Sequence, residues 1–142
     1  MKSLAILMTV LFFIAVQITK NEAGEKMKSQ SEDKLAVVWS SGDSEVAHKV
    51  CFMYTHNAKK QGWFDDVALI VWGPSAKLLA EDDSLQAKIS AMKKDGVTIE
   101  ACKACADMYG VTKNLETLGI AVKYMGAPLS EMLKQDWKML TF

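Results

Sequence analysis

The chain lacks a charge imbalance, because its 142 residues include 17 Lys and Arg and 17 Asp and Glu. This balance argues against a nucleic-acid-binding protein, which normally presents a basic surface. It also argues against a long disordered polyelectrolyte. Proline is scarce, with two residues, while apolar residues make up 50% of the sequence. Such a composition favours a single ordered domain with a buried core.

Cysteine is also scarce, and the glycines form no dinucleotide-binding or phosphate-binding signature. Three cysteines are too few for a small domain that is held together by disulfides. A haem-attachment motif requires His after the second cysteine of a C-x-x-C motif, and Ala106 stands at that position. The sequence therefore predicts no bound cofactor.

No apolar run reaches the ~20 residues that cross a bilayer as a helix. The longest one, residues 4–16, follows a short basic start and precedes a polar stretch. This order predicts a secretory signal peptide over residues 1–23, with an uncleaved N-terminal membrane anchor as the alternative. We therefore expect export, to the periplasm of a bacterium, and no other membrane association. Residues 24–33 are polar and predict a linker, which is followed by one domain over residues 34–142.

Strand and helix patterns alternate along this domain. Continuous apolar runs at residues 35–39 and 67–72 predict buried parallel strands, and a more alternating run at residues 97–101 predicts a strand nearer an edge. Further strands are expected at residues 120–124 and 139–142. The expected helices cover residues 44–61, a short segment around 78–79, a longer one ending near 96, residues 102–109, a turn around 115–118 and a helix that opens at Pro128. This order predicts a three-layer α/β/α sandwich around a mostly parallel sheet of about five strands.

Sheets of this kind bind ligands beyond the carboxyl ends of their strands. Three segments are expected to converge at that edge, namely residues 39–42, 72–75 and 101–102. The turn at residues 73–75 offers backbone N–H groups to an anion, and Asp43 either meets a ligand or caps the next helix. The candidate binding residues are Ser41, Gly42, Asp43, Gly73, Ser75 and Lys103.

The C-x-x-C motif, Cys102-Lys103-Ala104-Cys105, lies where the third strand ends and a helix begins. Free N–H groups and the positive end of the helix dipole favour the thiolate of Cys102, and Lys103 adds a nearby positive charge. Cys105, one turn later, is placed to form a disulfide with Cys102 or to act on a sulfur adduct there. Cys102 and Cys105 are therefore the catalytic candidates, with packing as small buried side chains as the alternative.

Zinc binding is another chemistry that a C-x-x-C motif supports, and a structural zinc site needs four ligands. The remaining candidate ligands are Cys51, His48 and His56, all in the predicted helix over residues 44–61. Nothing in the sequence brings that helix near Cys102, so we expect no metal. Cys51 falls on the apolar face of its helix, which predicts a packing role.

The segment GVTIEACKACADMYGV, residues 96–111, resembles the active-cysteine segment of the DsrE/DsrF family of sulfur-relay proteins, which are related to the tRNA-thiolation subunit TusD and to the YchN-like proteins. The segments KLAVVWSSGD, VALIVWGPSAKLL and GIAVKYMGAPLSEMLK agree with this pattern, so the resemblance spans residues 34–142. It implies a Rossmann-like α/β/α fold, assembly as a trimer or hexamer, and a persulfide on the family cysteine that corresponds to Cys102. Cys105 corresponds to the second cysteine of a subgroup.

Three functional hypotheses follow from the residues and the resemblance. The first is a sulfurtransferase-like carrier that holds sulfane sulfur as a persulfide on Cys102, with Cys105 as a second thiol. Its donor and acceptor would be a partner protein or a small thiol. The second hypothesis is a thiol–disulfide oxidoreductase that uses the same pair. The third is a non-catalytic, oligomeric binding module in which the cysteines are packed.

Overall fold

The computed structural model describes residues 33–142. The predicted signal peptide and all but the last residue of the predicted linker lie outside these residues. The strands are β1 (Lys34–Trp39), β2 (Asp66–Val71), β3 (Thr98–Cys102), β4 (Ala121–Lys123) and β5 (Lys138–Thr141). The helical segments are α2 (Ser44–Val46), the π-helical η1 (Ala47–Cys51), α3 (Phe52–Lys60), α4 (Pro74–Glu81), α5 (Asp83–Lys94), α6 (Lys103–Met108), α7 (Thr112–Thr117) and α8 (Gly126–Lys134).

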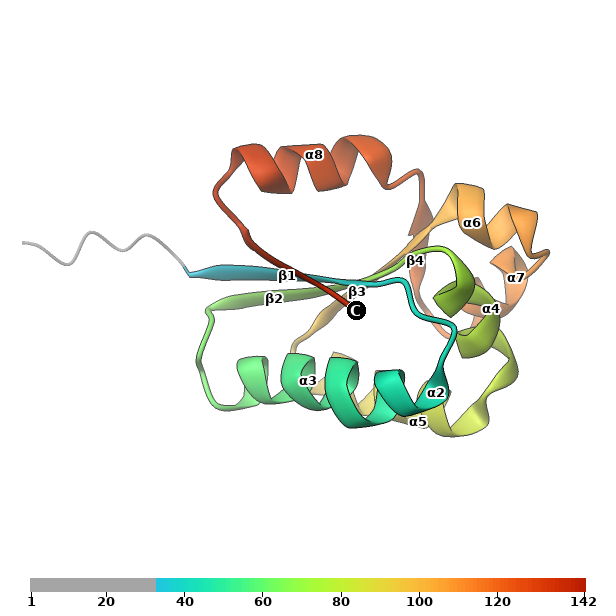
Figure 1. The fold of residues 1–142 in the computed structure, drawn as a ribbon, viewed down its shortest axis with the longest axis horizontal. Helices are drawn as coiled ribbons and strands as arrows, with labels where there is room; N and C mark the ends of the chain where they lie inside the picture. The colour runs from blue at the N-terminus through green and yellow to red at the C-terminus, as the bar shows by residue number, and fades with distance from the viewer. Residues whose placement is uncertain (1–32) are drawn as a thin grey trace, which may run out of the picture. The chain divides into compact units, whose positions relative to one another are not determined.

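The five strands form one sheet in the order β4-β3-β2-β1-β5, and every neighbouring pair is parallel. The first three connections advance across the sheet in one direction, and the fourth returns past β1 to its far side. Right-handed crossovers then place the helices that connect β1 to β4 on one face of the sheet and α8 on the other face. Figure 1 shows this division, with α2, α3 and α5 on one side of the strands and α8 on the opposite side. The prediction of a three-layer α/β/α sandwich is confirmed, and the sheet is parallel throughout.

The two faces of the sheet bury cores of different size. Leu35, Val37 and Trp39 of β1 belong to the larger core, which the helices between β1 and β4 cover. Alternate residues face the other side, where Ala36 joins a smaller core that includes Cys102. The helix α8 covers this smaller core with partly buried side chains, and none of its residues is fully buried. The cysteine motif therefore belongs to the thinly covered face of the sheet.

The helix predicted over residues 44–61 is interrupted by a π-helical turn. It starts as expected, because the Asp43 carboxylate accepts the N–H groups of Glu45 at 2.7 Å and Val46 at 3.3 Å. The N–H of Phe52 then bonds to the carbonyl of Ala47, five residues back, which closes the π turn η1. A pattern that assumes 3.6 residues per turn does not reveal such an insertion.

The strand predicted nearer an edge, β3, lies beside the edge strand, which is the three-residue β4. One further expectation differs in detail from the structure. Pro128 lies inside the first turn of α8, which begins at Gly126. Within residues 33–142, no helix is long and apolar enough to span a membrane.

Candidate active site

Cys102 is the last residue of β3 and the N-cap of α6. Its backbone is extended, with φ −72° and ψ 113°, so the chain turns from strand to helix at this residue. Only 4% of the residue is exposed, and it packs in the smaller core with Ala36, Ile70 and Met125. The cysteine is therefore held at the carboxyl edge of the sheet in a largely dry position.

Backbone N–H groups favour the ionised form of the Cys102 thiol. Burial opposes ionisation and is the largest single influence on the thiol, but the N–H groups of Cys105, Met125 and Ala104 and the Cys105 thiol together outweigh it. The pKa of Cys102 consequently lies below its ordinary value of 9.0. Two of these N–H groups belong to the start of α6, and the third comes from the segment after β4. The arrangement favours a thiolate, which is the nucleophilic form of cysteine.

Cys105 has the opposite electrostatic environment. Burial, the hydrogen bond to Cys102 and the nearby Cys102 charge raise the pKa of the Cys105 thiol, while the N–H of Gly73 acts against them. Gly73 has φ 68° and ψ −137°, a conformation open almost only to glycine, and this conformation brings the end of β2 to Cys105. Neither cysteine is in a disulfide. The pair thus consists of one thiol that favours ionisation and one that keeps its proton.

Lys103 lies beside the cysteines but is bound to its own helix. Its ammonium donates to both carboxylate oxygens of Asp107, at 2.9 and 2.6 Å, and lies 5.8 Å from the centre of the Tyr124 ring. Hydrogen bonding to Asp107 raises the pKa of Lys103, and Asp107 also accepts a bond from Thr112 at 2.7 Å. The positive charge near Cys102 is therefore already paired with a carboxylate.

The other predicted binding residues lie in the loop after β1 and, for Ser75, in the first turn of α4 after β2. These two segments are in contact. A Cβ added at Gly42 would lie 3.2 Å from the Cβ of Pro74. The Ser75 hydroxyl donates to the carbonyls of Trp39 at 2.6 Å and Trp72 at 3.0 Å, and so ties the ends of the two strands together. The Ser41 hydroxyl accepts the N–H of Asp43, whose carboxylate is the helix cap described above. The polar side chains of this group thus hold the loops in place.

A shallow recess of about 280 Å³ opens where these loops meet. It is lined by Gly42, Pro74, Lys77, Leu78, Glu81 and Tyr109. Neither cysteine is among its lining residues. The predicted residues Cys102, Cys105 and Gly73 therefore form one cluster, and Gly42 belongs to a separate recess at the same edge of the sheet.

Sequence reasoning did not identify Met125 or Glu100. Met125 contributes a backbone N–H, which every residue type except proline can supply, so its identity carries no signal. Glu100 lies two residues before Cys102 and on the same face of β3. One of its carboxylate oxygens accepts from Lys123 at 2.6 Å, and the other is buried without a partner among the described residues. The sequence offers a signal for Glu100, because a carboxylate in a buried strand is unusual.

The three remaining zinc candidates lie apart from the motif. Cys51 is fully buried in the larger core, and burial raises its pKa to about 12. Nε2 of His48 is 3.0 Å from Oγ of Ser84, and Nε2 of His56 is 2.6 Å from the Asp95 carboxylate. Across residues 33–142, no three His, Cys, Asp or Glu side chains are grouped to hold a metal ion.

The family model of the DsrE/DsrF-like family matches residues 33–142, which cover the whole described domain. The chain belongs to the DsrE/DsrF-like family. Membership in this family confirms the resemblance that was inferred from residues 96–111. It also agrees, in general terms, with a role in sulfur relay.

Two solved structures resemble this DsrE/DsrF-like domain. A conserved protein of unknown function from Bacteroides thetaiotaomicron is 38% identical, with a TM-score of 0.76, over 82% of this chain and 100% of that protein. The YchN protein of E. coli is 20% identical, with a TM-score of 0.60, over 78% of this chain and 99% of its own. At 20% identity the second similarity shows the fold alone. No match is found among curated proteins.

Proposed function

We propose that this DsrE/DsrF-like domain carries sulfane sulfur as a persulfide on Cys102. The observation that supports this proposal most strongly is the set of backbone N–H groups from Ala104, Cys105 and Met125 around one buried sulfur. These groups stabilise negative charge on the thiolate that attacks the sulfur donor. The family to which the chain belongs fits the same chemistry.

In the loading step, the Cys102 thiolate attacks the outer sulfur of a persulfide donor, R–S–S⁻. One S–S bond forms on Cys102 and the S–S bond of the donor breaks, so the donor leaves as the thiolate R–S⁻. The sulfane sulfur moves without a net change of oxidation state, and no proton needs to leave Cys102. A lowered pKa on Cys102 increases the fraction of the reactive form at neutral pH.

Cys105 is suited to the release step. After losing its proton it attacks the Cys102 sulfur, which forms the Cys102–Cys105 disulfide and breaks the bond to the outer sulfur. Sulfide leaves with the proton that Cys105 gave up. The two cysteines are oxidised while the sulfane sulfur is reduced to sulfide, so an external dithiol is required to restore the pair.

A thiol–disulfide oxidoreductase is the second candidate, favoured by the hydrogen bond between the Cys105 thiol and the Cys102 sulfur. A pair in this arrangement attacks a substrate disulfide through Cys102, and Cys105 then resolves the mixed disulfide. Both functions use the same first nucleophile. They differ in whether sulfur stays on Cys102 when Cys105 is absent.

We further propose that the domain acts outside the cytoplasm as a homo-oligomer, with a partner protein or a small thiol as sulfur donor and acceptor. The N-terminal sequence supports export. Exported thiol pairs meet an oxidising environment. Repeated sulfur transfer therefore depends on an external dithiol that reduces the Cys102–Cys105 disulfide. The exposed apolar side chains of Leu140, Val50 and Trp63, on and beside β5, support assembly.

Intact-mass measurement after exposure to inorganic polysulfide separates these functions. For sulfur carriage, the Cys105→Ala domain gains the mass of one sulfur atom, the Cys102→Ala domain gains none, and the wild type forms a disulfide and releases sulfide. An oxidoreductase forms the disulfide, but its Cys105→Ala variant retains no sulfur. Unchanged mass in all three proteins would contradict both functions and leave a binding role.

A further inference from the structure

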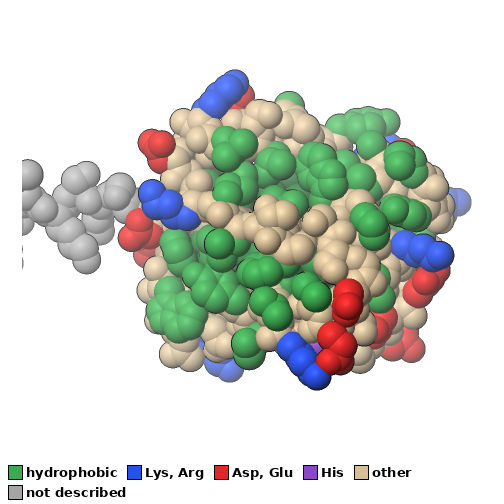
Figure 2. All heavy atoms as spheres, viewed as in Figure 1, with side chains coloured by type: hydrophobic (Ala, Val, Ile, Leu, Met, Phe, Trp, Pro, Cys, Tyr) green, Lys and Arg blue, Asp and Glu red, His purple; other side chains and the backbone are tan. Residues whose placement is uncertain are grey.

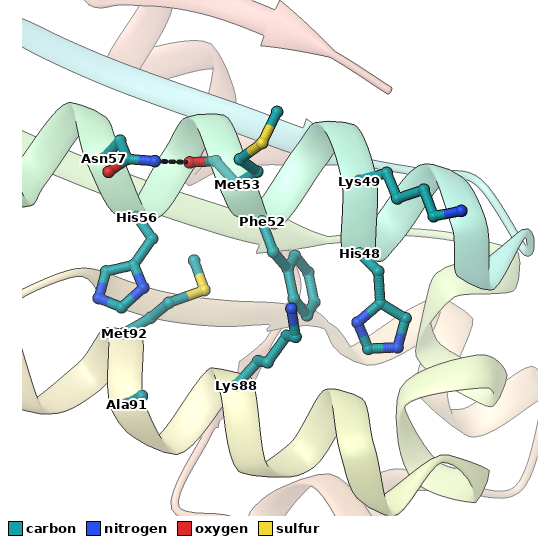
Figure 3. Close-up of a pocket in the computed structure, with 9 residues that line it drawn as sticks. All are labelled: His48, Lys49, Phe52, Met53, His56, Asn57, Lys88, Ala91 and Met92. Atoms are coloured by element: carbon teal, nitrogen blue, oxygen red, sulfur yellow. Dashed lines mark hydrogen bonds between the residues drawn. The ribbon is translucent and has the colours of Figure 1, made fainter.

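The groove between the parallel helices α3 and α5 lies apart from the cysteine site and has a distinct chemistry. It encloses about 550 Å³, which is within the range of small-molecule sites. The lining residues are His48, Lys49, Phe52, Met53, His56, Asn57, Lys88, Ala91 and Met92. Figure 3 shows the side chains of His48, His56 and Lys88 entering the space between the two helices.

The floor of the groove is apolar and rigid. Phe52 and Met92 are 2% and 0% exposed, and the Phe52 ring packs edge-on against Trp39 with 4.8 Å between ring centres. Met53 and Ala91 extend the apolar surface toward solvent. A ligand in this groove would therefore place an aromatic or alkyl body against a preformed surface.

The rim of the groove is basic. Lys49 is paired with Glu45, and His56 with Asp95, so these two groups are already compensated. The Lys88 ammonium has no hydrogen-bond or ion-pair partner within the part of the chain that the structure describes. His48 bonds only to the neutral Ser84 hydroxyl in that same part of the chain. Lys88 is thus the rim cation that has no ion-pair partner in that part of the chain, and its charge favours an anionic ligand.

A backbone irregularity lies at the same place. The π turn η1 contains His48 and Lys49 and directly precedes Phe52, so it sets how three lining residues are aimed. Isolated π turns inside helices are rare and occur often at functional sites. The turn thus provides an observation that is independent of the charges.

We propose that this groove binds a small anion with an apolar body, such as an aromatic or alkyl sulfonate or carboxylate. The apolar body lies against Met53 and Ala91, above the buried Phe52 and Met92, and the acidic group lies against the Lys88 ammonium. The site is separate from the cysteine pair, and its occupation does not depend on the persulfide function.

The experiment uses two dyes of similar shape, the anionic 8-anilinonaphthalene-1-sulfonate and the uncharged N-phenyl-1-naphthylamine, titrated by fluorescence. The wild-type chain is expected to bind the sulfonate saturably, at one site per chain, and more tightly than the uncharged dye. In Lys88→Glu, a carboxylate that repels the sulfonate replaces the ammonium that attracts it. This change should weaken sulfonate binding by about tenfold and remove the preference for the sulfonate over the uncharged dye. The matched control is Lys94→Glu, because Lys94 is on the same helix but does not line the groove.

Three results would overturn the proposal. One is the absence of saturable sulfonate binding to the wild type. Another is equal weakening by Lys88→Glu and Lys94→Glu, which would indicate a general charge effect. The third combines two observations. The wild type binds no dye, and Lys88→Glu changes the oligomeric mass that light scattering measures. That result would show that a second copy of the chain covers the groove. Circular dichroism melting of each variant checks that the fold is intact.

Discussion

At the scale of single residues, the reactivity of the motif depends on backbone groups more than on charged side chains. Lys103 is the only cation within the motif, and Asp107 already pairs with it. The N–H groups of Cys105, Met125 and Ala104 lower the pKa of Cys102 against the effect of burial. The thiolate character of Cys102 therefore depends on the turn from β3 into α6 and on the segment after β4.

Removal of one of these N–H groups gives the first test. Ala104 lies in the first turn of α6, where proline is tolerated because the helix does not use that N–H. Ala104→Pro should raise the pKa of Cys102, whereas Ala104→Gly keeps the N–H and should leave it close to the wild-type value. The measurement is the initial rate of iodoacetamide labelling of Cys102 against pH, by peptide mass spectrometry.

The pH dependence has a definite sign in this test. Thiolate forms as the pH rises through the pKa, so wild-type Cys102 should reach half its maximal rate below pH 9.0, and the proline variant at a higher pH. Cys51, with a pKa near 12, should stay unlabelled in the folded protein and serves as an internal reference. An unchanged profile for Ala104→Pro would contradict the role of the N–H groups.

The sequence predicted the cysteine pair but only part of its surroundings. The position of Cys102 at a strand end follows from local patterns, because the apolar run stops where the motif begins. The N–H of Met125 and that of Gly73 reach the pair through the tertiary fold, from positions 23 and 32 residues away in the sequence, counted from Cys102 to Met125 and from Gly73 to Cys105. Local patterns carry no information on such contacts.

At the scale of elements, helix caps account for several boundaries. Asp82 caps α5, because its carboxylate accepts the N–H groups of Ser84 at 2.9 Å and Leu85 at 3.0 Å and the Ser84 hydroxyl at 2.7 Å. These bonds, with that of the Ser84 hydroxyl as the largest contribution, lower the pKa of Asp82 below 3.8. A lowered carboxyl pKa means that the stabilisation is present above that pH and is lost as the pH falls further.

Asp82→Ala should therefore lower Tm by roughly 4 °C at neutral pH. The difference from the wild type should shrink as the pH falls below 3.8, where the carboxylate takes up its proton. Asp83→Ala is the matched control, because Asp83 lies in the same first turn but does not cap it. Equal losses of Tm for the two variants would show that general charge near the helix N-terminus, rather than the cap, is responsible.

Element boundaries were predictable where local chemistry determines them. Asp43 and the apolar runs gave the start of the first helix and the strands, because capping and burial act over a few residues. The π turn η1 was not predictable, since it inserts one residue into a helix whose apolar spacing looks regular. The alternating pattern of β3 agrees with its place beside the edge strand β4.

At the scale of the whole molecule, exposed apolar side chains lie on and beside the β5 edge. Among the described strands, β5 pairs only with β1, and Leu140 on it is 37% exposed on the α3 side of the sheet. Val50 and Trp63, 43% and 54% exposed, belong to the same side, and Trp63 packs against Tyr54 with 5.9 Å between ring centres. Figure 2 shows apolar side chains gathered on both sides of the band of backbone that crosses this face. Exposed apolar patches of this kind mark interaction sites.

Assembly through this edge predicts a mass effect. Leu140→Lys should shift the chain from an oligomer to a smaller species in light scattering, because the lysine would be buried against a second copy. Met108→Lys, at a methionine that is 79% exposed outside this edge, should leave the mass unchanged. A monomeric wild type would contradict the proposed assembly, as would equal effects of the two lysines.

The central claim is that Cys102 carries the sulfur, and one measurement tests it most directly. The Cys105→Ala domain is exposed to polysulfide, alkylated to trap persulfides, digested, and analysed by tandem mass spectrometry. The account predicts one extra sulfur atom on the Cys102 peptide and none on the peptide that contains Cys51. Extra sulfur on Cys51, or a Cys102 peptide that carries only the alkyl group, would contradict it.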